Sequence, residues 1–230
     1  TGAVRLLPRL EVTADRDKNL TGTSLEEMKS QVGRVPGGAE VVTAASAVEG
    51  RTADFQDFFQ KAIGIFLASD NAGEVSKISI RGSGLQSDEP LGVQILLDGL
   101  PLNQGDGEAN LEELDLSAIK GAEIYRGANA LRYGSYVLGG AINLSAMTGA
   151  DSPGFRTRLE AGSFGYRRAT IGAGIAADRA DTYVSLAGRQ TDGFREHNAE
   201  EAQVFNANLG FRISDTLQSR LYVSLSQWNR

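Results

Sequence analysis

The side chains that most often perform catalysis are scarce in this chain. No cysteine is present, which excludes disulfides, thiolate metal sites and cysteine nucleophiles. The single histidine, His197, lies in a charged segment, where a solvated side chain is expected. Residues 162–165 (GSFG) lack the spacing of a nucleophile elbow and are typical of a hairpin turn, and no phosphate-binding glycine motif occurs. We therefore predict that the chain is not an enzyme.

Carboxylates and basic side chains offer two further kinds of chemistry. Asp98, Asp106 and Glu108 lie within one stretch, but their spacing is not that of an EF-hand calcium loop. We therefore predict no metal site and no cofactor. The net charge is −6 and lysines and arginines do not cluster, so nucleic acid is not an expected partner, because a phosphate-binding surface needs a basic patch.

Glycine is the residue that departs most from average usage. There are 28 glycines among 230 residues, against a usual share of ~7%, and 5 prolines accompany them. This density indicates tight turns and close backbone contacts. The glycine-rich apolar stretch 133–144 (YGSYVLGGAINL) separates two halves with different patterns. No apolar run is long enough for a transmembrane helix, and no signal-peptide pattern opens the chain, so any such peptide is expected to have been removed.

The first half has the pattern of a compact α+β unit. Short apolar runs bounded by turn signals predict strands at 39–43, 75–82, 92–99, 122–126 and 141–145. Thr52 can cap a helix that has Asp54 in its first turn. The apolar residues at helical spacing, which predict a face packed into the core, are Phe55, Phe58, Phe59, Ala62 and Ile63. A second short helix is predicted from Asn110 toward Ile119, because NLEE has capping-box spacing.

The second half alternates apolar and polar residues through five segments of about ten residues each. The connections between them are 163–165, 178–181, the long 191–202 and 214–216. The apolar rows hold medium-sized side chains, whereas the opposite rows carry Arg, Asn, Gln and Gly. Phe205 and Phe211 lie near opposite ends of one apolar row, as the aromatic girdles of a membrane barrel require.

This alternation predicts a transmembrane β-barrel whose apolar face contacts outer-membrane lipid and whose polar face lines a lumen. A soluble sandwich with one wet face is the alternative. Bacterial barrels have even strand numbers, and an open edge in lipid would leave backbone groups unpaired. We therefore expect these strands to be the front part of a longer protein.

Five short motifs follow one another along the chain. They are Ile80-Arg81-Gly82, Leu97-Asp98-Gly99-Leu100-Pro101, residues 123–127 (EIYRG), Tyr133-Gly134 and residues 139–143 (GGAIN). Together they resemble the plug-domain pattern of TonB-dependent outer-membrane receptors. The resemblance implies an α+β plug domain at 21–150, followed at 151–230 by the first antiparallel strands of a transmembrane β-barrel of about 22 strands. Turn 163–165 and loop 191–202 are then extracellular, and turn 178–181 is periplasmic.

Residues 1–20 form an N-terminal tail that contains one β-prone patch. By itself this patch is typical of a first strand or a frayed end. The resemblance instead implies that it is the TonB box, which pairs as a strand with the energy transducer TonB. Its residues are Leu10, Glu11, Val12, Thr13 and Ala14. Few residues precede it, so no additional N-terminal signalling domain is expected in this chain.

The resemblance also implies a function and a set of sites. Such receptors lie in the bacterial outer membrane and import a scarce ligand, most often a ferric siderophore or another metal chelate, with force from TonB and its inner-membrane motor. The implied ligand contacts at the plug apex are Gln86, Asn103, Gln104 and Asp106. Acidic side chains there favour a ligand that is not strongly anionic. Arg81 and Arg126 resemble plug arginines that pair with wall carboxylates and latch the plug, and a local ion pair is the alternative.

Two alternatives stay open at this point. One keeps the fold and changes the cargo to cobalamin, a copper or zinc chelate, or an oligosaccharide. The other is a soluble α+β binding or adhesion module with an appended β-sandwich. The difference between import and adhesion depends on which face of the second half is buried.

Overall fold

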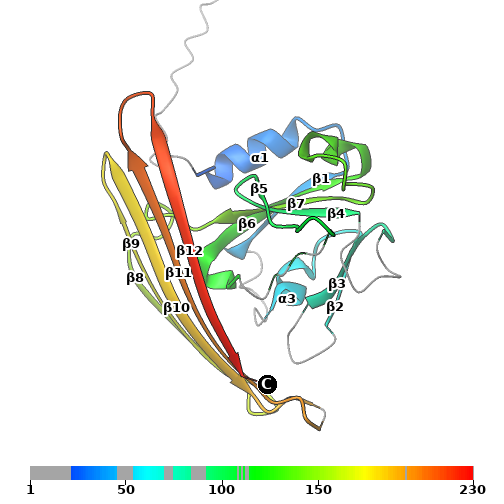
Figure 1. The fold of residues 1–230 in the computed structure, drawn as a ribbon, viewed down its shortest axis with the longest axis vertical. Helices are drawn as coiled ribbons and strands as arrows, with labels where there is room; N and C mark the ends of the chain where they lie inside the picture. The colour runs from blue at the N-terminus through cyan, green and yellow to red at the C-terminus, as the bar shows by residue number, and fades with distance from the viewer. Residues whose placement is uncertain are drawn as a thin grey trace, which may run out of the picture.

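The computed structural model describes residues 22–45, 54–69, 75–83, 92–107, 109, 111, 114–194 and 196–229. The predicted TonB box at 10–14 and the predicted ligand contact Gln86 lie outside these residues. Figure 1 shows two bodies: a tall curved sheet, drawn from yellow-green to red, and an α+β domain that lies against its concave side. None of the helices in the described part of the chain is long and apolar enough to cross a membrane.

The α+β domain is built on a mixed five-stranded sheet with the order β1-β6-β7-β4-β5. These strands are β1 (Ala39–Thr43), β4 (Val93–Leu97), β5 (Leu100–Pro101), β6 (Ile119–Arg126) and β7 (Gly140–Ala146). β4 and β7 pair in parallel, and the other pairs are antiparallel. A separate hairpin joins β2 (Ile65–Ser69) and β3 (Val75–Ile80). The five predicted strands are thus confirmed, and β2 and the two-residue β5 were missed.

The helices of this domain differ more from the prediction. α1 (Leu25–Gly33) was not predicted, and η2 (Gly127–Tyr133) is a 3-10 helix. α3 (Phe55–Phe59) is capped by the Asp54 side chain and is shorter than predicted. Its phenylalanines are buried, but Ile63 is 78% exposed, because the chain turns at Gly64 (φ 71°) into β2. The helix predicted from Asn110 toward Ile119 is reduced, within the described residues, to the 3-10 turn η1 (Leu116–Ala118), and Ile119 opens β6.

The second sheet is an antiparallel meander in which each strand pairs with its neighbours in sequence. Its strands are β8 (Gly154–Ala161), β9 (Arg167–Ala176), β10 (Ala180–Thr191), β11 (Glu200–Arg212) and β12 (Gln218–Asn229). The predicted order and turn positions are confirmed. The connection predicted at 191–202 is shorter, because β10 extends to Thr191 and β11 begins at Glu200.

The convex face of this sheet is apolar and the concave face is polar. Cross-strand pairing aligns Ile171, Leu186, Phe205 and Leu225 in one row, and all four side chains face away from the α+β domain. The alternate residues Asp181, Tyr183 and Ser185 are at most 2% exposed because they face that domain. A soluble sandwich would bury the apolar row, whereas this sheet buries the polar one. The observed faces therefore match a barrel wall around a plug.

The apolar face leads to a prediction about Leu209. This residue lies in a second outward-facing row, opposite Thr182 of β10 and Leu221 of β12. Replacing Leu209 with Lys is expected to destabilise the complete receptor in lipid bilayers by about 2–4 kcal/mol, the cost of a cation near the bilayer midplane. Urea unfolding in vesicles measures this change. Gln203→Lys is the matched control, because Gln203 lies on the same face of the same strand, beyond the apolar part of the row. Equal stability of the two variants would contradict a lipid-facing wall.

Candidate functional site

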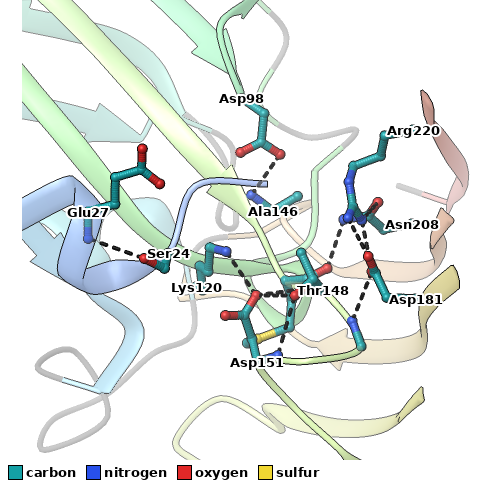
Figure 2. A network of polar contacts seen from close by, with 12 residues as sticks. Ser24, Glu27, Asp98, Lys120, Ala146, Thr148, Asp151, Asp181, Asn208 and Arg220 are labelled. Atoms are coloured by element: carbon teal, nitrogen blue, oxygen red, sulfur yellow. Dashed lines mark hydrogen bonds and ion pairs between the residues drawn. The ribbon is translucent and has the colours of Figure 1, made fainter. Parts of the chain in front are cut away.

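Several buried charged residues lie at the surface between the α+β domain and the wall, and one group of them lies where the chain crosses from the domain to the wall. At the crossing, Arg220 donates to both carboxylate oxygens of Asp181 (3.0 and 2.6 Å) and to Asn208 Oδ1 (2.7 Å). Asn208 in turn donates to the Met147 carbonyl (2.9 Å), and the Gly149 N–H donates to Asp181 (3.3 Å). Figure 2 shows Asp181, Asn208 and Arg220 converging beside the crossing segment. Their charges and hydrogen-bonding groups are thereby satisfied away from water.

Gly149 is required at this crossing for lack of space. A Cβ at this position would overlap the Ile175 carbonyl group and come within 2.7 Å of the Thr182 carbonyl oxygen. On the other side of the segment, Asp151 accepts from Lys120 Nζ (2.8 Å) and from the Thr148 hydroxyl (2.6 Å), as Figure 2 also shows. The segment is therefore held by β10 on one side and by β6 on the other.

A second contact is made by the short turn that precedes β6. The Asp115 side chain caps η1 through the Ser117 N–H (2.7 Å) and also accepts two hydrogen bonds from Arg168 of β9 (2.9 and 2.8 Å). Tyr183 donates to the Ser117 carbonyl (2.8 Å), and the Ser117 hydroxyl lies 3.3 Å from the Ser185 hydroxyl. One ion pair and two neutral hydrogen bonds thus dock this turn on the wall.

A third contact is made by the turn between β4 and β5. Asp98 has a left-handed backbone (φ 46°), and its Oδ2 accepts from the Tyr222 hydroxyl of β12 (2.7 Å) and from the Ala146 N–H (3.3 Å). Burial raises the pKa of the Asp98 carboxyl, and the bond from Tyr222 lowers it only in part. Asp98 Oδ1 is buried without a hydrogen-bond partner among the described residues. The ionised form of this carboxyl is therefore disfavoured in the folded state.

A polar network lies behind this turn in the sheet. The Gly99 N–H donates to Asn143 Oδ1 (2.8 Å), and Asn143 donates to Glu123 (2.8 Å). Burial and the nearby Glu123 carboxylate raise the pKa of Tyr125, so its hydroxyl stays protonated and donates to Glu123 (3.1 Å). The LDG, ExxRG and GGAIN motifs are thus joined by hydrogen bonds inside the sheet.

Gly140 of the GGAIN motif is required for lack of space, as Gly149 is at the crossing. A Cβ on Gly140 would overlap the Tyr125 carbonyl oxygen and press on Ile80 Cδ1. β7 therefore packs closely against β6 and β3, as the glycine-rich stretch 133–144 predicted.

The two arginines predicted to latch the plug lie close together. Arg126 Nε and Arg81 Cγ both lie within 4.0 Å of the position of a Cβ on Gly64. Arg126 forms an ion pair with Glu40 of β1 within the α+β domain. Arg81 follows β3 in a left-handed conformation (φ 56°). No wall carboxylate reaches Arg126 among the described residues, so the latch to the wall stays a prediction.

Among the described residues predicted to contact the ligand, Asn103 is half-buried, whereas Gln104 and Asp106 are exposed. The Asn103 amide accepts from Gln94 Nε2 (2.9 Å) and the Ile95 N–H (2.6 Å), and it donates to the carbonyls of Val93 (3.1 Å) and Gly107 (2.9 Å). Asn103 therefore has a structural role that the sequence did not indicate. Gln104 and Asp106 are exposed. Their contact with a ligand stays a prediction, as does that of Gln86.

Residues that sequence reasoning missed are Asp115, Arg168, Asp181, Arg220 and Tyr222. The signal for Arg168 and Arg220 was present, because both lie in the polar rows predicted to face a lumen. Their partners could not be predicted from the sequence, because Asp181 is brought to Arg220 by the pairing of the wall strands, and Asp115 is brought to Arg168 by the docking of the α+β domain on the wall. No group of three or more His, Asp or Glu side chains in the described ranges is placed to hold a metal ion.

An α+β domain that lies on the polar concave face of a sheet with an apolar convex face is the arrangement expected of a plug and part of the wall of a plugged β-barrel. Residues 31–141 match the family model described as the TonB-dependent Receptor Plug Domain. Residues 31–141 are thus similar in sequence to the plug of TonB-dependent receptors, and the strands that follow share the fold of the first wall strands of such receptors.

Relatives of known function extend this similarity. The chain is 29% identical over 205 residues to the hemin receptor of Yersinia enterocolitica, covering 82% of this chain and 28% of the relative. It is 22% identical over 186 residues to the vitamin B12 transporter BtuB of Vibrio cholerae, covering 80% and 28%. The chain thus spans just over a quarter of the length of these curated relatives.

Solved structures share the fold. The siderophore receptor PirA from Acinetobacter baumannii superposes with a TM-score of 0.61 at 21% identity, covering 89% of this chain and 33% of that chain. The siderophore receptor PiuA from the same organism gives a TM-score of 0.66 at 16% identity, covering 84% and 27%.

The crossing network predicts the effect of removing one of its charges. Asp181→Ala leaves Arg220 buried without its carboxylate and the Gly149 N–H without an acceptor, so the complete receptor is expected to lose about 3–5 kcal/mol of stability. Urea unfolding in detergent measures this loss. Asp215→Ala is the control, because Asp215 is exposed in the turn between β11 and β12. A midpoint unchanged by Asp181→Ala would show that the network does not hold the plug.

The Asp98 contact predicts a pH dependence. Because the folded pKa of Asp98 is raised, its contribution to stability is present at low pH and is lost as pH rises through the raised value. Asp98→Asn keeps an acceptor for Tyr222 without the charge, so its stability relative to the wild type should improve between pH 4 and pH 7. Unfolding at several pH values measures this difference, with the exposed Asp106→Asn as control. A pH-independent difference for Asp98→Asn would contradict the raised pKa.

Proposed function

We propose that the receptor to which this chain belongs imports a metal chelate across the bacterial outer membrane, driven by TonB. The observation that carries this proposal is the polar character of the wall side of the surface between plug and wall. The polar contacts that cross this surface include an ion pair through Asp115 and hydrogen bonds through Asp98 and Asp181. Water can replace such contacts when the plug moves, whereas a large apolar seam would resist opening.

The class of ligand is supported by the relatives. A hemin receptor, a vitamin B12 transporter and siderophore receptors share sequence or fold with this chain. Hemin, vitamin B12 and ferric siderophores are all metal complexes with an organic chelator. We infer that the ligand of this receptor belongs to the same chemical class and that its first contacts include Gln104 and Asp106 on the plug.

The coupling to TonB is supported by the sequence of the tail. Residues 10–14 (LEVTA) have the composition of a strand that adds to the sheet edge of a partner. Main-chain hydrogen bonds carry such a pairing, so it transmits a pulling force with little dependence on side chains. In this proposal TonB binds the tail from the periplasm and displaces part of the plug.

Replacing Val12 with Pro tests this coupling, because proline removes a main-chain donor from the ladder. In cells that carry the complete receptor, Val12→Pro is expected to reduce chelate uptake to the level of a strain without TonB, while chelate binding at the cell surface stays unchanged. Val12→Ala, which keeps the N–H, is the matched control. Retained uptake in Val12→Pro cells would refute the assignment of the box.

The ligand itself is identified by purifying the complete receptor from metal-starved cells. Mass spectrometry and metal analysis of the purified receptor are expected to find a metal and its organic chelator in equal amounts. A co-purifying oligosaccharide without metal would instead overturn the chelate proposal.

A further inference from the structure

A cavity of ≈ 110 Å³ lies between the plug and the first strands of the wall. On the plug side it is lined by apolar residues and by Ser117. On the wall side it is lined by the polar row of β8 and β9, which supplies Arg156, Arg158, Glu160 and Arg168. The charges around the cavity therefore come from the wall, and positive charge is in excess.

The three arginines of this cavity, which we call the arginine strip, differ in how they are paired. Arg158 donates to Glu160 (3.1 Å), and Arg168 is held by Asp115 of the plug. Arg156 forms no hydrogen bond or ion pair within the described part of the chain. With Asp115 in place the strip has three cations and two carboxylates, and with Asp115 withdrawn only Glu160 remains to balance them.

Asp115 meets Arg168 through a single guanidinium nitrogen, Nη2, which donates to both carboxylate oxygens. Both carboxylate oxygens accept from one guanidinium group (2.9 and 2.8 Å), and the Arg168 side chain is 6% exposed. Charge-assisted bonds of this kind are strong and selective for carboxylate or phosphate, the more so where water is partly excluded. The plug carboxylate thus occupies a place that a carboxylate from outside the chain would fit.

We propose that the arginine strip (Arg156, Arg158 and Arg168) binds an anionic group, carboxylate or phosphate, of the imported chelate, and that Asp115 fills this site while the receptor is at rest. The ligand class rests on the proposed function. The strip belongs to the wall, so it stays in place when the plug moves, and withdrawal of η1 exposes it. An anionic cargo is thereby drawn along β8 and β9, which differs from the sequence-based prediction of a ligand that is not strongly anionic.

The site is tested directly by anion binding to the purified complete receptor. Asp115→Asn keeps the cap on η1 but removes the charge that competes for Arg168. Isothermal titration with citrate, a tricarboxylate, is expected to show binding tighter by about tenfold or more in Asp115→Asn than in the wild type. Adding Arg156→Gln and Arg158→Gln to that variant should abolish the gain, whereas adding Arg167→Gln, on the opposite face of β9, should preserve it.

Citrate affinity that is unchanged by Asp115→Asn, or unchanged by the loss of Arg156 and Arg158, would overturn the proposal. A second measurement does not depend on Asp115→Asn folding. In cells, Arg156→Gln with Arg158→Gln should lower uptake of hemin, which carries two carboxylates, by about tenfold, and leave its surface binding and the uptake of neutral cyanocobalamin unchanged. Equal loss for both chelates would contradict an anion site. If the wild type takes up neither hemin nor cyanocobalamin, that result counts against import of these two chelates. The citrate titration then tests anion binding by the arginine strip on its own.

Discussion

The rest of the structure depends on the pairing of charges on the inner face of the wall. Because the apolar rows of β8 to β12 face outward, the side chains that face the plug are polar, and several are charged. A charge left unpaired in a partly dry interface is costly, so each must find a partner on the wall, on the plug or in water. The fold pairs Asp181 with Arg220, and it pairs Arg168 with Asp115. The plug therefore completes the electrostatics of the wall as well as blocking its lumen.

This constraint explains where the plug touches the wall. The three described contacts come from irregular segments, namely the turn after β4, the turn before β6 and the crossing after β7. Turns have main-chain groups that are not used in a ladder, so they can offer carbonyls and N–H groups to the wall. The Ser117 and Met147 carbonyls and the Gly149 N–H are used in this way. The regular strands of the plug meanwhile keep their own sheet intact.

Much of the fold could be predicted from the sequence, and the successes share a cause. A period of two and a short apolar run between turn signals are both local, so the wall strands and most of the plug strands were found, although β2 and β5 were missed. Local signals failed where they were weak or contested: α1 buries Met28 alone among its residues, and α3 ends early because Gly64 turns the chain. The polar face of the wall was predicted, but its pairs were not, because Asp115 and Arg168 lie far apart in the chain and meet only through docking. The structural role of Asn103 could not be predicted, because its hydrogen bonds to Gln94, Ile95, Val93 and Gly107 form only in the folded turn, and its contact with a ligand stays a prediction.

The polar contacts between plug and wall determine position more than stability. A buried ion pair gains little free energy over an apolar contact of the same size, because desolvation offsets most of the Coulomb attraction. Its geometry is nevertheless strict, since Asp115 must meet Arg168 with both oxygens while Tyr183 reaches Ser117. Such an interface fixes the plug in one place, and the lumen that surrounds it can hydrate the same groups when the plug leaves. A plug that must be both accurately seated and displaceable is better served by these pairs than by a hydrophobic seam.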